Sequence, residues 1–274
     1  MPLMSEIHPT AIVGKNVQLG IGNVIGPHVI IEDDVRLGSH NTLMAGAYLC
    51  RGTTLGNHNE IHMQAVVGHT PQDLAYQGAP SYTKIGNNNK IREFVTIHRG
   101  TKEGSTTVIG DDNFIMAYCH IAHNCELGNQ IIMVNQASLT GYCTVGDKAF
   151  ISGMTGFHQF TRMGKLAMLS ALSAVNKDIP PYMLCGGRPG VILGINTVGL
   201  RRAGFSAAAR EEIKRAYKLL YRSGLNVTQA LEAIEQELSD EAVRHLVDFI
   251  KASKRGICDG AENEGETETL KARK

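Results

Sequence analysis

Tryptophan is absent from the sequence, and aromatic residues make up only 5% of its 274 residues. Glycine is abundant instead, with 30 copies, and hydrophobic residues reach the 43% of an ordinary globular protein. With so few rings available, the core has to consist mainly of aliphatic side chains packed close to the backbone. Such a core is unusual for a β-sandwich or a Rossmann fold.

A strong charge imbalance is also missing, since the formal net charge is +1. Nothing in that composition indicates a protein that binds nucleic acid. No stretch approaches the roughly 18 uninterrupted apolar residues of a membrane span. The first residues, MPLMSEIHPTAIVG, lack a basic region followed by an apolar run. We therefore expect no membrane span and a cytoplasmic location. The six cysteines are scattered without a CxxC spacing, which argues against a zinc knuckle or a secreted disulfide scaffold.

A repeat of six residues runs through most of the chain. A period of six fits neither an α-helix nor a plain alternation of polar and apolar residues. It is typical of short strands joined by tight corners, three strands to a coil. The residue four positions after each apolar one is mostly small or asparagine. With two interruptions, the apolar series comprises Ile7, Val13, Leu19, Ile25, Ile31, Leu37, Leu43, Leu49, Leu55, Ile61, Val67, Ile85, Ile91, Ile97, Ile109, Ile115, Ile121, Leu127, Met133, Leu139, Val145, Ile151, Phe157, Met163, Leu169 and Val175.

We therefore predict a mainly β protein, with a left-handed parallel β-helix of hexapeptide repeats over residues 1–199. The left-handed coil, known for this repeat, is an exception to the usual right-handed crossover. Residues 18 apart would stack on successive coils, about 4.8 Å from each other. Cys125 and Cys143 form such a pair, and we expect both to be reduced thiols that fill small interior slots.

Two segments, 68–84 and 98–108, interrupt the repeat and rejoin it in phase. A regular coil gains little from extruding a loop, so function is commonly added at such excursions. Asp73 lies in the first loop and His98 opens the second. The alternative for Asp73 is a turn carboxylate that caps backbone amides.

The pattern changes toward the C-terminus. Pro180 and Pro181 are expected to end the coil. A helical period begins at Ser206, which reads as an N-cap, and two further helices are expected through LEAIEQEL and EAVRHLVDFIKAS. We predict a helical domain over residues 200–256 that caps the open end of the β-helix, and a disordered tail over 257–274.

Four histidines near the loops lie outside the apolar positions: His98, His120, His123 and His158. Histidine also occurs at ordinary repeat corners, so position alone makes none of them functional. The chain lacks the HxxxxH pair of the β-helical carbonic anhydrases, and no metal site is expected. A histidine near its ordinary pKa of about 6.5 can instead accept a hydroxyl proton as a general base.

Gly141 stands 18 residues, or one coil, beyond His123. A glycine at that place leaves its amide accessible, and an accessible N–H beside a base is what the oxyanion of an acyl transfer requires. Base and oxyanion donor at one-coil spacing predict an acyltransferase site.

Seven motifs resemble the UDP-N-acetylglucosamine O-acyltransferase that begins lipid A synthesis, and the similarity extends from Ile7 to about Gly256. They are, in order, GHTPQDL, IREFVTIHRGT, HIAHNC, MTGFHQF, DIPPYM, GLRRAGFS and AYKLLYRSG. The resemblance implies a homotrimer with active sites between neighbouring subunits. It implies transfer of an R-3-hydroxyacyl chain from acyl carrier protein to the glucosamine 3-position of UDP-GlcNAc. No cofactor is implied beyond the phosphopantetheine that carries the acyl donor.

The same resemblance implies roles for individual residues. His123 would be the general base and the Gly141 amide the oxyanion donor. Arg201 and Arg202 would contact the nucleotide phosphates or the phosphopantetheine of the carrier, and Ala171 falls near the position that sets acyl length. The other positions implied to bind substrate are Asp73, His98, His120, His158, Gln159 and Asn196.

Residues 201–222 include seven basic residues and two acidic ones. Acyl carrier proteins are strongly acidic, so this segment is suited to steering one toward the site. The alternative is an ordinary solvated helix face.

Some residues depart from the family pattern. Asn124 follows the candidate base where Asp is common, while Tyr142, Ala75 and Val198 replace histidine, lysine and glutamate. An amide can orient an imidazole but cannot balance its positive charge. The departures keep open transfer to a 3-amino sugar nucleotide, giving an amide. Two further alternatives are a related N-acyltransferase, whose N-terminal uridine-binding domain has no counterpart before Ile7, and a non-catalytic β-helical scaffold.

Overall fold

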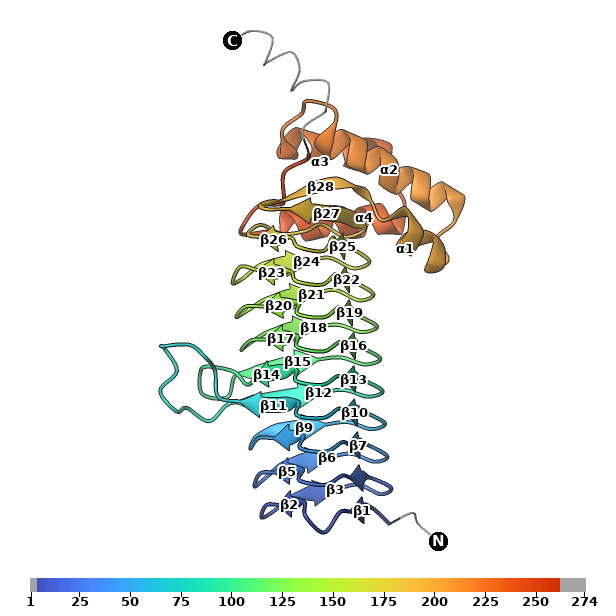
Figure 1. Cartoon of the computed structure of the whole chain (residues 1–274). Coiled ribbons are helices and arrows are strands. Elements are labelled where there is room, and N and C mark those ends of the chain that lie inside the picture. Colours follow the sequence, from blue (N-terminus) through green and yellow to red (C-terminus); the bar gives the residue numbers. More distant parts are fainter. Residues whose placement is uncertain (1–3, 262–274) are drawn as a thin grey trace.

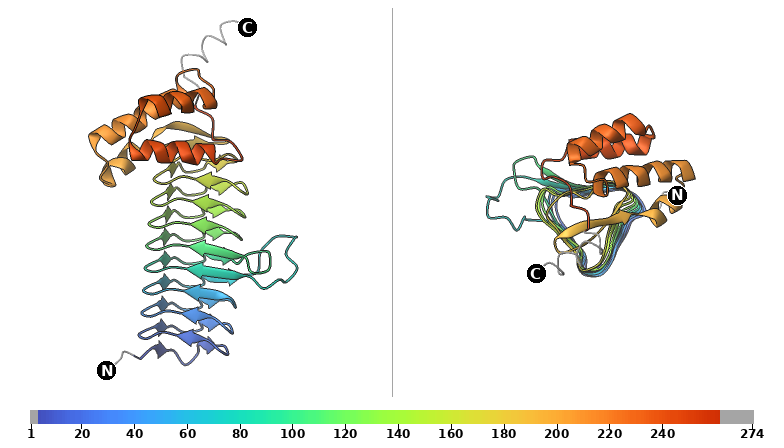
Figure 2. Two further views of the ribbon diagram at one scale, coloured as in Figure 1. Left: turned by 180° about the vertical axis from the view of Figure 1, so that it is seen from behind. Right: turned by 90° about the horizontal axis from the view of Figure 1, so that it is seen from above.

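The computed structural model describes residues 4–261 as a left-handed parallel β-helix with helices at its C-terminal end (Figure 1). Each coil contributes one short strand to each of three sheets, so the coils stack into a three-sided prism (Figure 2). Every sixth residue of the apolar series faces the interior, as the repeat predicts; the register pairs Ile7 with Ile25 and Ile121 with Leu139. The 18-residue spacing therefore becomes one coil of the prism.

The three sheets are named here A, B and C. Sheet A contains β1 (Glu6–Ile7), β4 (Val24–Ile25), β7 (Thr42–Leu43), β10 (Glu60–Ile61), β13 (Lys90–Ile91), β16 (Phe114–Ile115), β19 (Ile132–Met133), β22 (Phe150–Ile151), β25 (Met168–Leu169), β27 (Met183–Gly187) and β28 (Gly190–Ile195). Sheet B contains β2 (Ile12–Val13), β5 (Ile30–Ile31), β8 (Tyr48–Leu49), β11 (Val66–His69), β14 (Thr96–His98), β17 (His120–Ile121), β20 (Ser138–Leu139), β23 (Gly156–Phe157) and β26 (Ala174–Val175). Sheet C contains β3 (Gln18–Leu19), β6 (Arg36–Leu37), β9 (Thr53–Leu55), β12 (Tyr82–Ile85), β15 (Thr106–Ile109), β18 (Glu126–Leu127), β21 (Thr144–Val145) and β24 (Arg162–Met163).

Tight corners join the strands, and at nearly every corner one residue adopts a positive φ. It stands three positions after the apolar residue, as at Asn124 (φ 58°), Tyr142 (φ 60°) and Phe160 (φ 65°). Asparagine tolerates this conformation better than a ring does, so the aromatic corners carry a backbone cost that their packing has to offset. These three corners connect sheet B to sheet C and lie one above another.

Two loops leave the prism on the same side (Figure 1; Figure 2). Both follow strands of sheet B and precede strands of sheet C, as the interruptions at 68–84 and 98–108 predict. The strands extend into each interruption, so the first loop spans only 70–81, between β11 and β12, and the second only 99–105, between β14 and β15.

The prediction that Pro180 and Pro181 end the coil is wrong. Ile179 still forms a parallel bridge with Met163, and β27 pairs in parallel with β25. Proline lacks a backbone donor and has a fixed φ, but these two prolines lie in the connection before β27, where no ladder bond from them is needed. The antiparallel β27–β28 hairpin then closes the prism.

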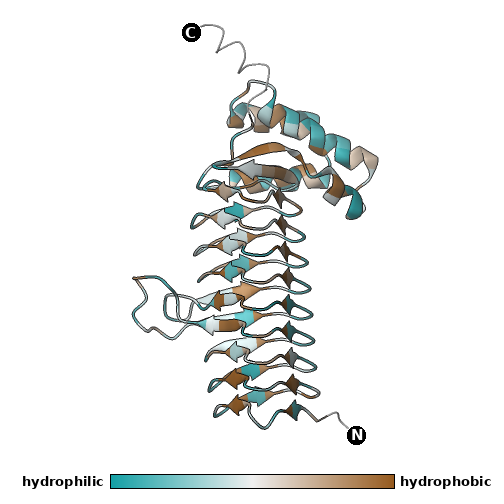
Figure 3. Cartoon of the chain, in the orientation of Figure 1, coloured by the Kyte–Doolittle hydropathy of each residue, from teal (hydrophilic) through white to brown (hydrophobic). Residues whose placement is uncertain are grey.

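Four helices follow: α1 (Thr197–Arg202), α2 (Ala207–Tyr221), α3 (Val227–Glu237) and α4 (Glu241–Lys251). Ser206 caps α2 as the sequence predicts, its side chain accepting from the amide of Ala209, whereas α1 was not expected. Figure 3 shows hydrophilic and hydrophobic segments along these helices, which is typical of helices covered on one side only.

The prediction of a disordered tail from residue 257 is also wrong for residues 257–261. Ile257 and Cys258 are buried, Ile257 bridges Asp178, and Gly260 bridges Ile192. The rest of the predicted tail, residues 262–274, lies outside the described residues.

Candidate active site

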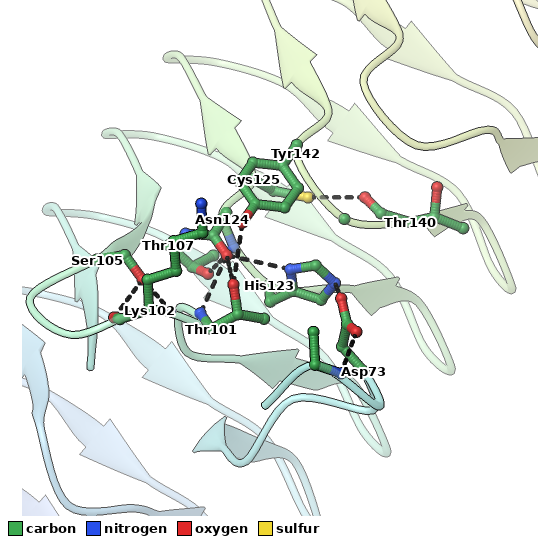
Figure 4. Close-up of polar contacts among 12 residues, drawn as sticks. Asp73, Thr101, Lys102, Ser105, Thr107, His123, Asn124, Cys125, Thr140 and Tyr142 are labelled. Atoms are coloured by element: carbon green, nitrogen blue, oxygen red, sulfur yellow. Dashed lines mark hydrogen bonds and ion pairs between the residues drawn. The ribbon is translucent and has the colours of Figure 1, made fainter. Parts of the chain in front are cut away.

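The candidate base lies at the corner between sheets B and C, on the coil after the two loops. His123 follows β17, and its side chain is almost fully buried at 4% exposure. Figure 4 shows the imidazole between Asp73 of the first loop and Asn124 of its own corner. Nε2 lies 3.2 Å from Asp73 Oδ2, and Nδ1 lies 3.1 Å from Asn124 Oδ1.

The second loop determines which nitrogen of His123 is basic. Thr101 directs both its backbone N–H and its hydroxyl at Asn124 Oδ1, at 3.1 and 3.0 Å. These donors identify that atom as the amide oxygen, because an amide NH₂ cannot accept them. His123 Nδ1 must therefore carry a proton and donate it to Asn124, which leaves Nε2 as the nitrogen that can accept one.

The first loop supplies the negative charge beside the His123 ring, through the carboxylate of Asp73. Asp73 Oδ1 accepts from the amide of Ala75 at 2.8 Å, and its backbone oxygen accepts from the amide of Tyr76. The expected capping role is therefore correct for one carboxylate oxygen, and it leaves Oδ2 facing His123. An imidazolium formed at Nε2 is balanced by this carboxylate, so the charge that Asn124 cannot provide comes from Asp73.

Gly141 packs directly against the imidazole. A Cβ on this residue would lie 2.2 Å from His123 Cε1 and 2.4 Å from Nε2, so only glycine fits. Within residues 4–261, no acceptor is bonded to the Gly141 N–H. The predicted stacking of Gly141 on His123 across one coil is thus confirmed, whereas the roles of base and oxyanion donor stay predictions.

Tyr142 forms the outer wall beside the base. Its ring meets the His123 ring edge-on, with centroids 5.3 Å apart, and stacks on Phe160 one coil further. Its hydroxyl lies 3.0 Å from Thr101 Oγ1. Because the Thr101 hydroxyl donates to Asn124, the tyrosine donates to Thr101. The tyrosine therefore joins the network that orients the base.

A row of further imidazoles lies on sheet B beside the base. His98 and His120 pack edge to face with centroids 4.8 Å apart, and His69 is tilted against His98. Burial, followed by the neighbouring His120, lowers the pKa of His98 to about 4. Burial also lowers the pKa of His120, whose Nδ1 lies 2.7 Å from Thr96 Oγ1. Both rings are neutral at pH 7 and suit a polar, uncharged ligand group.

The other residues singled out from the sequence lie farther along the prism. His158 is exposed at the end of β23, with Gln159 next to it, and Ala171 is exposed beyond β25. Asn196 is buried as the N-cap of α1: its Oδ1 accepts from Gly199 N–H and its Nδ2 donates to Leu166 O.

Arg201 and Arg202 are exposed on α1. Arg202 and Asn196 line a cavity of about 560 Å³ on sheet A, with Gln130, Ile132, Phe150 and Met168 among the other lining residues. One chain therefore does not bring the α1 arginines to His123, which lies at the corner between sheets B and C.

Sequence reasoning missed Thr101, Thr107 and the exact orientation of Asn124. The backbone N–H of Asn124 donates to Thr107 Oγ1 at 2.7 Å. The six-residue repeat is enough to place Asn124 and Tyr142 one coil apart. It cannot place Thr101, because Thr101 belongs to the second loop, which lies outside the repeat.

No group of three or more metal-ligating side chains occurs in the part of the chain that the structure describes. Within the same residues, no helix is both long and apolar enough to cross a membrane. The cysteines are all buried free thiols, including Cys125 and Cys143.

Comparison with known proteins gives concordant matches. Residues 178–258 match the family model for Udp N-acetylglucosamine O-acyltransferase, domain 2, and residues 106–141 match the bacterial transferase hexapeptide. The chain is 50% identical to the acyl-[acyl-carrier-protein]–UDP-N-acetylglucosamine O-acyltransferase of Janthinobacterium sp., covering 93% of this chain and 99% of that one. The enzyme of the same name from Halorhodospira halophila is 48% identical over 93% and 99%.

Solved structures agree. A UDP-N-acetylglucosamine acyltransferase from Bacteroides fragilis superposes with a TM-score of 0.84 at 41% identity, covering 94% of this chain and 99% of that one. The enzyme from Campylobacter jejuni gives a TM-score of 0.89 at 38% identity, covering 93% and 100%.

Proposed function

Because the chain belongs to the acyl-[acyl-carrier-protein]–UDP-N-acetylglucosamine O-acyltransferase family, we propose that His123 and Gly141 catalyse the transfer of an acyl chain from acyl carrier protein to UDP-GlcNAc. This is the first step of lipid A biosynthesis. The alternative product, an amide on a 3-amino sugar, finds no support, since the relatives are named O-acyltransferases. The observation that carries the residue assignment is the buried imidazole with one defined basic nitrogen beside a free amide.

In the proposed reaction, the glucosamine 3-hydroxyl lies against His123 Nε2. As its oxygen attacks the thioester carbonyl of an R-3-hydroxyacyl donor, its proton passes to Nε2. The resulting oxyanion accepts a hydrogen bond from the Gly141 N–H. Collapse of the tetrahedral intermediate forms the ester and breaks the carbon–sulfur bond. The phosphopantetheine sulfur leaves with the proton that His123 held, so the base is regenerated.

Asp73 acts on the base in this scheme. Its carboxylate balances the imidazolium while the proton is held on His123. The neutral rings of His98 and His120 bind hydroxyl groups of the sugar without adding charge. The proposed steps use only side chains and backbone groups of the protein and the phosphopantetheine that carries the acyl chain.

The acyl chain is assigned to sheet B. A groove of about 450 Å³ lies on the coils beyond the base, lined by residues that include Phe157, His158, Ala174, Val175 and Pro189. Its wall is mostly hydrocarbon, which suits a fatty chain. Ala171 lies near this end of the prism and is our candidate for limiting chain length.

We assign the docking of acyl carrier protein to α1 and α2. Arg201, Arg202, Lys214, Arg215, Lys218 and Arg222 are exposed there. Only two of these, Lys214 and Arg215, form ion pairs within residues 4–261, with Glu211 and Glu237. The unpaired surplus would attract the acidic carrier.

We also propose a homotrimer whose active sites are shared between subunits. The α1 arginines and His123 lie on different faces of the prism, so a neighbouring copy is needed to bring them together. An exposed apolar column on the corner between sheets A and B supports this packing; it comprises Phe94, Tyr118, Met154 and Leu172. The free buried cysteines fit a reducing compartment, which supports the cytoplasm as the location.

The deciding experiment is an acyl-transfer assay with purified protein, UDP-GlcNAc and R-3-hydroxyacyl carrier proteins of several lengths. We expect transfer to UDP-GlcNAc that is abolished in His123→Ala, with the sedimentation mass of a trimer. Transfer that persists in the variant would refute the role of His123. A functional monomer would refute the shared sites.

A further inference from the structure

We propose that a second cavity, separate from the His123 site, binds a phosphate-bearing small molecule. This arginine pocket has a volume of about 690 Å³ and is lined by Arg36, Arg51, Arg99, Tyr76, Tyr82 and Ser81 among other residues. It lies beneath the first loop and against β6, β9 and β12, on the N-terminal side of the base. Neither His123 nor Asp73 is among its lining residues.

The charge in the arginine pocket is only partly balanced. Arg51 pairs with Asp33 and with Asp34, the one acidic residue that lines the pocket, with N–O distances of 2.8 and 3.5 Å. Arg36 and Arg99 form no ion pair with any carboxylate among residues 4–261. Two guanidinium groups are thus available to an anion, and guanidinium groups match the oxygen geometry of phosphate.

Two residues that line the pocket, Ser81 and Arg99, each carry a buried donor without a partner among the described residues. Ser81 is 4% exposed, and its hydroxyl forms no hydrogen bond within the described residues. Nε of Arg99 is likewise buried and unpartnered there. A buried donor without an acceptor is costly, and both of these atoms require an oxygen to bond. Both atoms are closed to solvent, so the oxygens of a bound phosphate reach the Ser81 hydroxyl after a change in its χ1 rotamer.

The walls of the pocket are held in place before any ligand binds. Arg99 donates through Nη1 to the backbone oxygen of Arg51 at 3.1 Å and through Nη2 to the hydroxyl of Tyr76 at 3.2 Å. That hydroxyl donates to Ala79 O within the same loop. Preorganised donors lose little entropy on binding, so the site is suited to a ligand of modest size.

The size of the cavity favours an organic phosphate over a bare ion. A volume of about 690 Å³ lies in the range of small-molecule sites. Tyr82 is about half exposed and offers a flat apolar face beside the guanidinium groups. The combination of cation, buried hydroxyl and aromatic ring is suited to a phosphate joined to a sugar or a base.

Inorganic pyrophosphate is the test probe, titrated calorimetrically into the full-length protein at low ionic strength. We expect saturable binding that Arg36→Gln and Ser81→Ala each weaken by about five- to tenfold. Ser81→Ala should leave the unfolding midpoint unchanged or higher, because the hydroxyl bonds nothing in the empty pocket. Arg92→Gln is the matched control, since Arg92 pairs with its neighbour Glu93 outside the pocket and the variant should bind as wild type does.

Three outcomes would overturn the proposal. Absence of saturable binding would show that the pocket takes no phosphate. An equal loss in Arg36→Gln and Arg92→Gln would show diffuse charge attraction only. Binding that is abolished by Arg202→Gln and untouched by Arg36→Gln would place the anion at α1 instead. None of these results depends on transferase activity, so failure here is distinct from failure of the proposed function.

Discussion

The carboxylate of Asp73 should contribute to catalysis through its charge, and Asp73→Asn tests this. The N–O distance to His123 Nε2 is 3.2 Å. Two unit charges at that distance interact by about 5 kcal/mol at an effective dielectric constant of 20. The side chain of Asp73 is 25% exposed, and water takes over part of its role in the variant. We therefore expect a loss of about 2–3 kcal/mol, or about 30- to 150-fold in kcat/KM.

A second substitution makes the prediction specific. Asn124 Oδ1 lies 3.1 Å from the other ring nitrogen of His123. Asn124→Asp retains the acceptor for Thr101 and adds a charge at nearly the same distance from the ring. In the Asp73→Asn background it should restore about tenfold of the lost activity.

The assay measures release of the carrier thiol during transfer to UDP-GlcNAc, with Glu103→Gln as the control. Glu103 is an exposed carboxylate of the second loop, and its variant should retain wild-type activity. If Asp73→Asn were as active as wild type, the charge argument would fail. If activity fell but Asn124→Asp restored none of it, Asp73 would act by contacting the acceptor and not by balancing the imidazolium.

Three further predictions concern the site and the fold. Gly141→Ala places a Cβ 2.2 Å from the His123 ring and should lower kcat/KM at least about a hundredfold. Gly156→Ala is the control, because a Cβ there meets nothing within 4 Å. Its circular dichroism spectrum should be that of the folded wild-type protein. The folded-state pKa of His98 is about 4, below the ordinary 6.5. Between about pH 6.5 and pH 4 the unfolded chain therefore binds a proton at His98 that the folded protein does not. The free energy of unfolding falls as the pH drops through this range. Urea unfolding should show that His98→Gln removes about 2 kcal/mol of the stability difference between pH 7 and pH 5; an unchanged difference would contradict the buried neutral ring. Ser206→Ala removes the cap of α2 and should cost about 1 kcal/mol of unfolding free energy, which a wild-type melting curve would disprove.

The sequence by itself determined the coil and the stacking of Gly141 on His123. The period of six dictates where each strand and corner falls, because every coil repeats the same backbone geometry. Residues 18 apart are therefore stacked without any further information, and Gly141 can be placed on His123 from the numbering alone. The two interruptions were equally visible, since they break a phase that the rest of the chain keeps.

Only the tertiary structure decided how the loops meet the coil. The contact of Asp73 with His123 and the bonds from Thr101 to Asn124 join segments with no common period, so no spacing predicts them. The C-terminal errors have a similar origin: residues 257–261 pack because β28 and Asp178 offer them backbone partners, which no local pattern in the segment reveals. Local propensity describes what a segment prefers alone, whereas long-range hydrogen bonds decide where it lies once the prism has formed.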